Sequence, residues 1–434
     1  MNKIKIDKNL TIDKIREQAV SKKLILYGAG TAVSSYARIA LWVLDSLEIK
    51  PTFFIDDDES RWETEFEGIP VYSPEYLKKY DLSLHTIIIT SNYFESIFKS
   101  LEKIDLDISV SSMYALLNNV DISTFDDKIS FEEVNRRMHT HYSKLERIIN
   151  YQNNNNNEIF FNALDIQVTE KCTMKCLDCS NLMQYYDDPK DIPIEVVIKN
   201  IKLILSNIDR LADARVIGGE PFLNKKLFEL IEILVESNKV EHITIYSNAT
   251  FVPSEETLKA MSKVQKLHVE FTDYEALSKG KAKLPDVLKK WGIPYFFHKP
   301  QNWTDSSRIF NRTLNNNELS EMFEACCVND ALTLLGDRLY HCPFSANLYN
   351  MKAIDSVHTD WIDLTEDFNI EQLRSKIKKF YYGQKFLNAC RYCAGRDFQQ
   401  EIVTPAIQVK RFIPIHLRKE WNYVEHSNTD ITQK

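Results

Sequence analysis

The stretch ALDIQVTEKCTMKCLDC, residues 163–179, joins a short apolar segment to three closely spaced cysteines. Residues 163–169 alternate in polarity and are rich in apolar and β-branched side chains, which is typical of a strand. The cysteines follow at positions 172, 176 and 179, in the loop directly after that strand. In parallel α/β folds these loops lie at the edge of the sheet where active sites collect. The stretch therefore predicts a parallel sheet with a cysteine-rich site at its carboxyl edge.

Strand-like and helix-like segments alternate after this stretch. The further strands are predicted over residues 213–219, 242–248, 266–272 and 294–299. Amphipathic helical segments separate them, so that strands recur about every 25–30 residues after a first longer gap, the rhythm of a barrel or a doubly wound sheet. Only five or six strand–helix units fit before the rhythm ends near residue 305, which is too few for a full eight-fold barrel. We expect a partial (β/α)6 barrel over residues 161–310.

The remainder of the chain suggests four further segments. Residues 22–30 (KKLILYGAG) form an apolar run that ends in a glycine-rich turn, and strand-like segments recur later, which predicts a Rossmann-like parallel-sheet module over 1–120. The low-complexity run of asparagines marks a linker over 121–160. Residues 311–400 hold the later cysteines and a predicted hairpin, and residues 401–434 are expected to form a C-terminal tail.

Composition excludes several classes of protein. The net charge of −8 argues against nucleic-acid binding, since phosphate contacts need a basic surface. No apolar run approaches the length of a membrane span, and the first ten residues lack the apolar stretch of a signal peptide. We therefore expect a cytoplasmic protein without membrane contact. Eight cysteines in that compartment are better explained by metal ligation than by disulfides.

The cysteine spacing and a second motif resemble the radical S-adenosylmethionine (SAM) superfamily. Cys172, Cys176 and Cys179 are followed by GGEP, residues 218–221, at the end of the next strand. In that family three cysteines hold a [4Fe–4S] cluster whose fourth iron binds SAM. The reduced cluster cleaves SAM to a radical that abstracts hydrogen from a substrate. The family places an aromatic residue, which shields the cluster, where this chain has Asp178.

The resemblance also implies residues for SAM. Gly218 and Gly219 would admit the methionine amino group, with Glu220 paired to it, although a glycine pair can also simply end a strand. Ser247 and Asn248 match the place of ribose contacts, and could equally be a turn or cap. Asp273 and Tyr274 are candidates for contact with SAM or substrate, and Asp273 could instead cap a loop.

A second set of cysteines resembles the shortened SPASM or twitch extension that carries an auxiliary [4Fe–4S] cluster in this family. Its members are Cys326 or Cys327, Cys342, Cys390 and Cys393. One of the adjacent pair would be a core cysteine, and we favour Cys327 as the ligand. A structural zinc site is the alternative, because C-x2-C pairs also bind zinc.

The N-terminal module looks like the nucleotide-sugar-binding domains of glycan-modifying enzymes. Gly28 and Gly30 could accommodate a phosphate at a helix start, and Asp56 stands where a ribose hydroxyl would be bound. Valine replaces the last glycine of the dinucleotide fingerprint, so NAD binding is not expected. The alternative is a structural α/β domain that only positions the catalytic part.

These features predict a radical SAM enzyme that oxidises or epimerises a sugar, amino sugar or nucleotide-sugar. An external donor such as flavodoxin or ferredoxin would supply the electron. Two alternatives stay open: a radical SAM enzyme that modifies a peptide, and a scaffold that binds iron–sulfur or zinc without catalysis.

Overall fold

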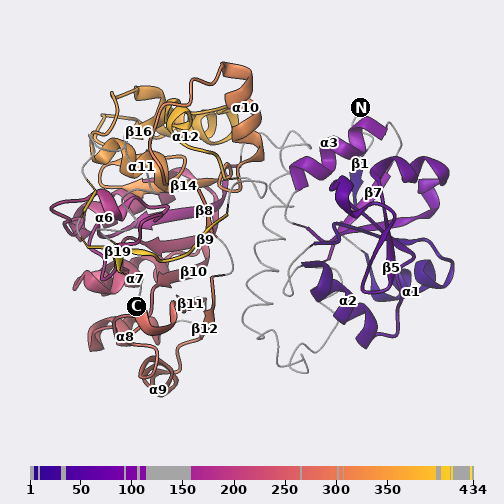
Figure 1. Ribbon diagram of the computed structural model, residues 1–434, viewed down its shortest axis with the longest axis horizontal. Helices are drawn as coiled ribbons and strands as arrows, with labels where there is room; N and C mark the ends of the chain where they lie inside the picture. The colour runs from indigo at the N-terminus through magenta and orange to yellow at the C-terminus, as the bar shows by residue number, and fades with distance from the viewer. Residues whose placement is uncertain are drawn as a thin grey trace. The chain divides into compact units, whose positions relative to one another are not determined.

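The computed structural model describes residues 4–7, 10–30, 36–91, 94–104, 108–113, 158–263, 266–300, 303–305, 307–396, 402–410, 412–413 and 431–432. The chain divides into two compact units, Met1–Glu158 and Ile159–Lys434 (Figure 1). Apart from its last three residues, the predicted linker of residues 121–160 with its asparagine run lies outside the described residues. Within the described part of the chain, no helix has the length and apolarity needed to cross a membrane.

The first unit is built on a seven-stranded sheet in the order β1-β7-β6-β2-β3-β5-β4. All neighbouring strands are parallel except the β4–β5 pair. The strands are β1 (Ile4–Ile6), β2 (Leu24–Tyr27), β3 (Phe53–Ile55), β4 (Thr64–Phe66), β5 (Ile69–Tyr72), β6 (Thr86–Ile89) and β7 (Ile108–Ser112). The predicted parallel sheet is confirmed here.

Helices cover both faces of this sheet, because its central strands are apolar on both sides. Side chains from α1 (Ile12–Val20) and α2 (Tyr36–Ser46) form one core with one face of the strands. Side chains from α3 (Phe94–Ile104) form a second core with the other face. The unit is therefore a three-layer α/β arrangement.

The second unit is built on an eight-stranded sheet in the order β12-β11-β10-β9-β8-β14-β15-β16. Its first five strands are parallel and follow the chain order, as the alternation of the sequence predicts. They are β8 (Phe160–Gln167), β9 (Arg210–Ile217), β10 (Val240–Ser247), β11 (Leu267–Thr272) and β12 (Tyr295–His298). The sixth parallel strand, β14 (Ala331–Leu335), joins on the other side of β8.

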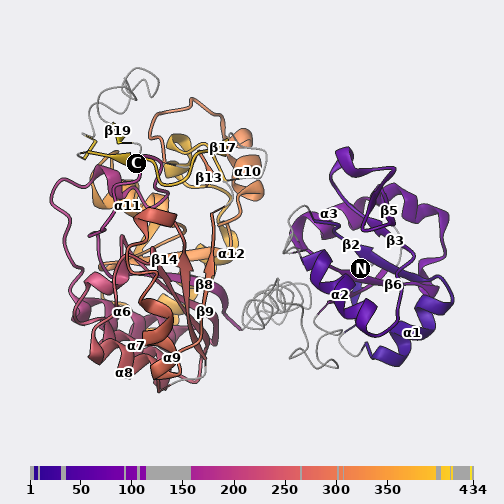
Figure 2. The ribbon, with the colours of Figure 1, turned by 60° about the horizontal axis from the view of Figure 1, so that its bottom comes forward.

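Four helices follow the strands and pack on one face of this sheet (Figures 1 and 2). They are α6 (Ile194–Asn207), α7 (Leu227–Glu236), α8 (Glu255–Met261) and α9 (Leu284–Trp291), and each packs beside the next. Their apolar side chains meet alternate strand residues such as Leu164, Ile166 and Val216 in the main core. Because strand side chains alternate, the intervening residues lie on the opposite face.

The later part of the chain extends the sheet and adds helices. The predicted hairpin is confirmed as β14 paired with β15 (Arg338–Tyr340), with Gly336 at a φ of +59° in the turn, and β16 (Trp361–Asp363) completes the sheet. Its helices are α10 (Asn316–Ala325), α11 (Pro343–Asn350) and α12 (Ile370–Gly383). Two short pairs, β13 (Trp303–Thr304) with β17 (Ile402–Val403) and β18 (Gln408–Val409) with β19 (Ile431–Thr432), involve the C-terminal segment (Figure 2).

Candidate active site

The first cysteine set lies in the loop after β8, at the carboxyl edge of the sheet, as predicted. Lys171 N donates to Thr169 Oγ1 at 3.1 Å, which fixes the start of the loop at the end of the strand. Cys179 N donates to Cys176 O at 3.3 Å and turns the loop back. Cys176 is buried, and Cys172 and Cys179 are half-buried. The three thiols therefore share one loop that is largely withdrawn from water.

The glycine pair after β9 makes room for this loop. A Cβ atom on Gly218 would lie 2.7 Å from Thr169 O, and one on Gly219 would lie 2.2 Å from Lys171 O. Gly219 N donates to Thr169 O at 3.1 Å. The pair is thus required by the close approach of the cysteine loop itself. That contact accounts for both glycines whether or not SAM also reaches them.

Glu220 is fully buried and holds two strand ends together. Its Oε2 accepts from Ser247 Oγ at 3.0 Å and from Asn248 N at 2.9 Å, and its Oε1 accepts from Phe222 N at 3.3 Å. Burial raises the pKa of Glu220 to about 7, although these donors oppose the rise. The carboxylate therefore joins the GGEP loop to the end of β10. A cationic ligand nearby would favour its charged form.

Asn248 connects the end of β10 to the first cysteine. Its Nδ2 lies 3.5 Å from Cys172 Sγ and donates to Thr173 Oγ1 at 3.0 Å. Ser247 is engaged with Glu220, as described above, so both predicted ribose residues are in contact with the cysteine loop or its support. Thr173 was not among the predicted site residues. A polar residue directly after the first cysteine could have indicated a contact here.

Asp273 and Tyr274 follow β11 but differ in their surroundings. Asp273 forms an ion pair with Lys281 and accepts from Glu275 N at 2.9 Å. Burial alone would raise the pKa of Asp273, yet the contacts with Lys281 and Glu275 lower it below its usual value. These contacts match the loop-capping alternative. Tyr274 instead packs against the apolar surroundings of the cysteine loop, and its ring lies 5.9 Å from that of Trp303.

Asp178 does not shield the cysteines in the manner of an aromatic residue. It is 5% exposed, and its Oδ1 accepts from Ser307 Oγ at 3.2 Å and from Arg308 Nε at 3.3 Å. Burial raises the pKa of Asp178, and the Arg308 guanidinium opposes the rise. The side chain ties the cysteine loop to the segment around residue 307.

The environment of the first three sulfurs fits metal-bound thiolates. Burial raises the pKa of Cys176 to about 12 and raises the pKa of Cys172 and Cys179, so the free thiols stay protonated. Nevertheless N–H groups point at the sulfurs: Met174 N at 3.5 Å from Cys172 Sγ, and Gln408 Nε2 at 3.2 Å from Cys176 Sγ. Donors of this kind stabilise a thiolate once a metal has replaced its proton.

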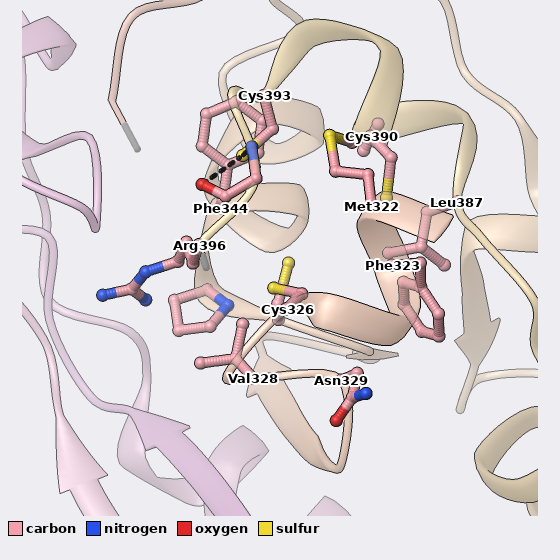
Figure 3. A pocket seen from close by; sticks show the side chains of 14 residues that line it. Met322, Phe323, Cys326, Val328, Asn329, Phe344, Leu387, Cys390, Cys393 and Arg396 are labelled. Carbon is pink, nitrogen blue, oxygen red and sulfur yellow. Dashed lines mark hydrogen bonds between the residues drawn. The ribbon is translucent and has the colours of Figure 1, made fainter. Parts of the chain in front are cut away.

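The second set of cysteines lines one apolar pocket in the later part of the chain (Figure 3). Cys326 ends α10, Cys342 caps the start of α11, and Cys390 and Cys393 lie in and after the 3-10 helix Asn388–Tyr392. Burial raises the pKa of all four, and for Cys393 to about 11. Mutual repulsion also raises the pKa of Cys390 through Cys342, Cys393 and Cys326. The four sulfurs therefore share one enclosure.

Cys326 and Cys327 differ clearly. Cys326 lines the pocket and is half-buried, whereas Cys327 is exposed and is absent from the pocket lining. The geometry thus favours Cys326 as the fourth ligand, which reverses our preference for Cys327. Adjacent residues leave a strand or helix end in different directions, and the sequence does not show which direction faces the pocket.

Among the described residues, no three His, Cys, Asp or Glu side chains surround one point closely enough to hold a single metal ion. A [4Fe–4S] cluster takes one thiolate per iron, so its ligands need only line a common cavity.

The predicted nucleotide residues of the first unit make structural contacts. Asp56 Oδ2 accepts from Ala29 N at 2.7 Å and Oδ1 accepts from Asp58 N at 2.9 Å, so backbone amides engage both carboxylate oxygens. Gly28 has a φ of +103°, and a Cβ there would lie 2.6 Å from Ser91 Cβ. Gly30 has a φ of +65°. These contacts favour the structural alternative for the module.

A row of polar side chains that the sequence analysis missed crosses the face opposite the helices. Asp165, Arg215, Thr244 and His268 are register partners on β8, β9, β10 and β11, and we call them the polar row. Asp165 Oδ1 accepts from Arg215 Nε at 2.6 Å. Burial raises the pKa of Asp165, and Arg215 opposes the rise. The polar residues that alternate with apolar ones in the predicted strands, as in ALDIQVT, could have indicated this row.

Comparison with known proteins gives the affiliation of part of the chain. Residues 166–275 match the radical SAM superfamily, and residues 20–110 match the C2185-like N-terminal family. A GTP 3′,8-cyclase from Helicobacter pylori is 28% identical over 85 residues, 19% of this chain and 26% of that protein. The chain thus aligns with about a quarter of the length of this curated relative.

Several solved structures resemble the chain at low identity. BtrN in complex with AdoMet and 2-DOIA shares 16% identity, with 57% of this chain and all of that chain covered and a TM-score of 0.35. For anSMEcpe with bound AdoMet the identity is 12%, the coverage 62% and 97%, and the TM-score 0.34. Streptococcus suis SuiB bound to S-adenosylmethionine shares 14% identity, with 72% of this chain and 64% of that chain covered and a TM-score of 0.28. The match over residues 166–275 makes this part of the chain a radical SAM domain, a type of enzyme domain that binds a [4Fe–4S] cluster and SAM.

Proposed function

We propose that this chain, whose second unit contains a radical SAM domain, abstracts hydrogen from a sugar, amino sugar or nucleotide-sugar. Cys172, Cys176 and Cys179 would hold the SAM-binding cluster. When bound, the cluster and SAM supply a 5′-deoxyadenosyl radical that takes a hydrogen atom from the substrate. The observation that supports the substrate class best is the polar row on the sheet face opposite the helices.

The cysteine loop and its supports would place SAM at the carboxyl edge of the sheet. Glu220 is fixed by Ser247 and Asn248, so its position is set before any ligand arrives. Its raised pKa means that the ammonium group of SAM would favour the carboxylate form and gain a charge-assisted contact. The half-buried Tyr274 would help to exclude water from the same side.

The polar row suits a substrate that carries hydroxyl and amino groups. Asp165 and Arg215 offer an acceptor and a planar set of donors. The Thr244 hydroxyl donates to Asp213 Oδ1 at 2.8 Å, so it could only accept from a ligand, and one ring nitrogen of His268 pairs with His242 at 2.6 Å. A hydroxyl-bearing carbon oxidised by hydrogen abstraction must also lose an electron. We propose that the pocket of Cys326, Cys342, Cys390 and Cys393 holds an auxiliary [4Fe–4S] cluster that accepts it, as in a twitch-type extension of an open (β/α)6 barrel.

Two alternatives remain distinct from this proposal. A peptide substrate would place one side chain against the polar row and leave the rest of the peptide outside. A zinc ion in the second cysteine pocket would leave that site structural, because four thiolates saturate zinc. An external one-electron donor such as flavodoxin or ferredoxin is needed for the radical chemistry in either case.

Isotope transfer tests the substrate class. The reduced, reconstituted protein is incubated anaerobically with SAM and deuterated sugars, amino sugars or nucleotide-sugars, and deuterium is measured in 5′-deoxyadenosine. Transfer from one of these supports the proposal, and the Arg215→Met variant should lose most of it while still cleaving SAM without substrate. Transfer only from peptides would replace the proposal with the peptide alternative. No SAM cleavage at all would favour a binding scaffold.

Metal analysis tests the two cysteine sets. The full chain should approach about eight irons, from two four-iron clusters. Cys326→Ser should lower the iron content, whereas the matched change Cys327→Ser, at an exposed neighbour, should not. One zinc per chain retained by a Cys172/Cys176/Cys179→Ala variant would assign the second pocket to zinc.

A further inference from the structure

The C-terminal segment packs on the first cysteine loop. Leu177 N donates to Ile407 O at 2.7 Å and Val409 N donates to Lys175 O at 2.8 Å, so that Cys176 and Gln408 face each other across an antiparallel bridge. No motif in the sequence suggests a role for this part of the chain, which follows the first three cysteines by more than two hundred residues. The segment is thus a wall of the site.

The side chain of Gln408 reaches a cysteine sulfur. Its Nε2 lies 3.2 Å from Cys176 Sγ and donates to Ala406 O at 2.8 Å, while its Oε1 accepts from Lys175 N at 2.8 Å. The Lys175 amide can only donate, so the amide oxygen of Gln408 must face it. The NH2 group is therefore directed at the sulfur by the backbone itself.

The surroundings of this contact are apolar. Cys176 is 8% exposed and Ala406 is 7% exposed, and both pack with Met174. The segment is anchored beyond the cysteine loop as well, since Val403 pairs with Trp303 and Ile413 N donates to Gln184 O at 2.8 Å. Water is largely kept from Cys176, so the Gln408 amide is a direct polar neighbour of its sulfur.

We propose that Gln408 is a positioning residue that raises the reduction potential of the SAM-binding cluster through its N–H···S contact with Cys176. Hydrogen bonds to the sulfurs and solvent exposure both set the potential of such clusters. A donor stabilises the reduced state more, because that state carries more negative charge on sulfur. The proposal rests on the proposed function in one respect, the assignment of Cys176 as a cluster ligand.

The test is a redox titration followed by electron paramagnetic resonance, with dithionite as the one-electron reductant. The signal that changes on adding SAM identifies the first cluster. Gln408→Met removes both the donor and the acceptor at similar length, and we expect full iron content with a midpoint potential shifted to more negative values. Thr404→Met places the same side chain at an exposed, uncharged position of the same segment and should leave the midpoint unchanged.

A second variant keeps the proposal testable if Gln408→Met does not assemble its cluster. Gln408→Glu keeps an acceptor for Lys175 N but offers the sulfur no N–H, so its midpoint should also move to more negative values. An unchanged midpoint in either fully loaded variant would overturn the proposal. Loss of the SAM-responsive cluster in both, with the cluster of Thr404→Met intact, would also overturn it in favour of a purely structural role. A wild-type protein without a SAM-responsive cluster would instead refute the proposed function.

Discussion

Replacing Gly219 with alanine tests whether the glycine pair exists to admit the cysteine loop. The new Cβ would lie 2.2 Å from Lys171 O, 2.6 Å from Lys171 C and 2.7 Å from Cys172 Cβ. Real Cβ contacts essentially never fall below 3.0 Å, so the carbonyl oxygen must move by about 0.8 Å. Gly219 is not among the glycines with a positive φ, so the clash is the main cost.

The atoms in the way are mainly backbone atoms of the loop that holds Cys172, which cannot rotate aside as a side chain does. Inserting a methyl group into packed structure costs about 1–3 kcal/mol, and we expect a value near the upper limit. Gly218→Ala, whose nearest contact would be 2.7 Å from Thr169 O, should cost less. The displaced loop should also bind its cluster less well.

The measurements are urea unfolding of the metal-free protein and iron content after reconstitution. Gly383→Ala is the matched control, because its nearest contact would be 3.9 Å from Lys379 Cγ and it ends helix α12. That change should be neutral, or stabilising by up to about 1 kcal/mol. If Gly219→Ala unfolds like the wild type and takes up full, SAM-responsive iron, the steric argument is wrong.

Three further outcomes are expected. Glu220 has a pKa of about 7 in the folded protein against 4.5 when exposed, so the free energy of unfolding should fall by about 3 kcal/mol as pH rises from about 4.5 through 7. The metal-free Glu220→Gln variant should lack this decline. Parallel pH–stability curves for the variant and the wild type would refute the prediction. Gly28→Ala should destabilise the first unit in thermal unfolding more than Gly68→Ala does. Both glycines have a positive φ, but only at Gly28 would the new Cβ meet a close neighbour, Ser91. Equal losses of stability would leave only backbone strain as the cause. Asp178→Asn should cost about 1–3 kcal/mol in urea unfolding by weakening a buried ion pair, and the loss should shrink in an Arg308→Met background; an unchanged loss would show that the pair does not couple.

Local patterns predicted the central strands of both sheets, because alternating or continuous apolar residues are enough to identify strands such as β8 and β2. The outer strands β1, β4, β5, β7 and β16 were not predicted. The position of Cys172 just after a strand also followed from the sequence alone. The neighbours of that cysteine did not. Gln408 meets Cys176 through the fold of the whole second unit, and no local pattern records such a distant contact.

The adjacent pair Cys326 and Cys327 shows a second kind of limit. Spacing requires one of them, and both satisfy it equally well. The choice is made by burial at the end of α10, where only Cys326 turns into the pocket. Asp56 is similar, since an acidic residue after a strand suggested a ribose contact. Its oxygens are used by Ala29 and Asp58 instead.

Arg396 is a charged neighbour of both cysteine sets. Burial raises the pKa of Cys179, Cys342 and Cys393, and in each case the Arg396 guanidinium opposes the rise, so one cation acts on both sets. Figure 3 shows the guanidinium directed away from the second pocket, while the Arg396 carbonyl accepts from Cys327 N at 3.1 Å.

A variant of the second set that shifts the backbone at Cys327 and Arg396 would also move this charge relative to Cys179. Iron lost from the first site in a variant of the second set does not by itself show shared ligands. In such a variant the first cluster could be weakened or missing altogether. The response of the remaining signal to SAM separates these two cases, because a weakened first cluster still binds SAM whereas a missing one cannot.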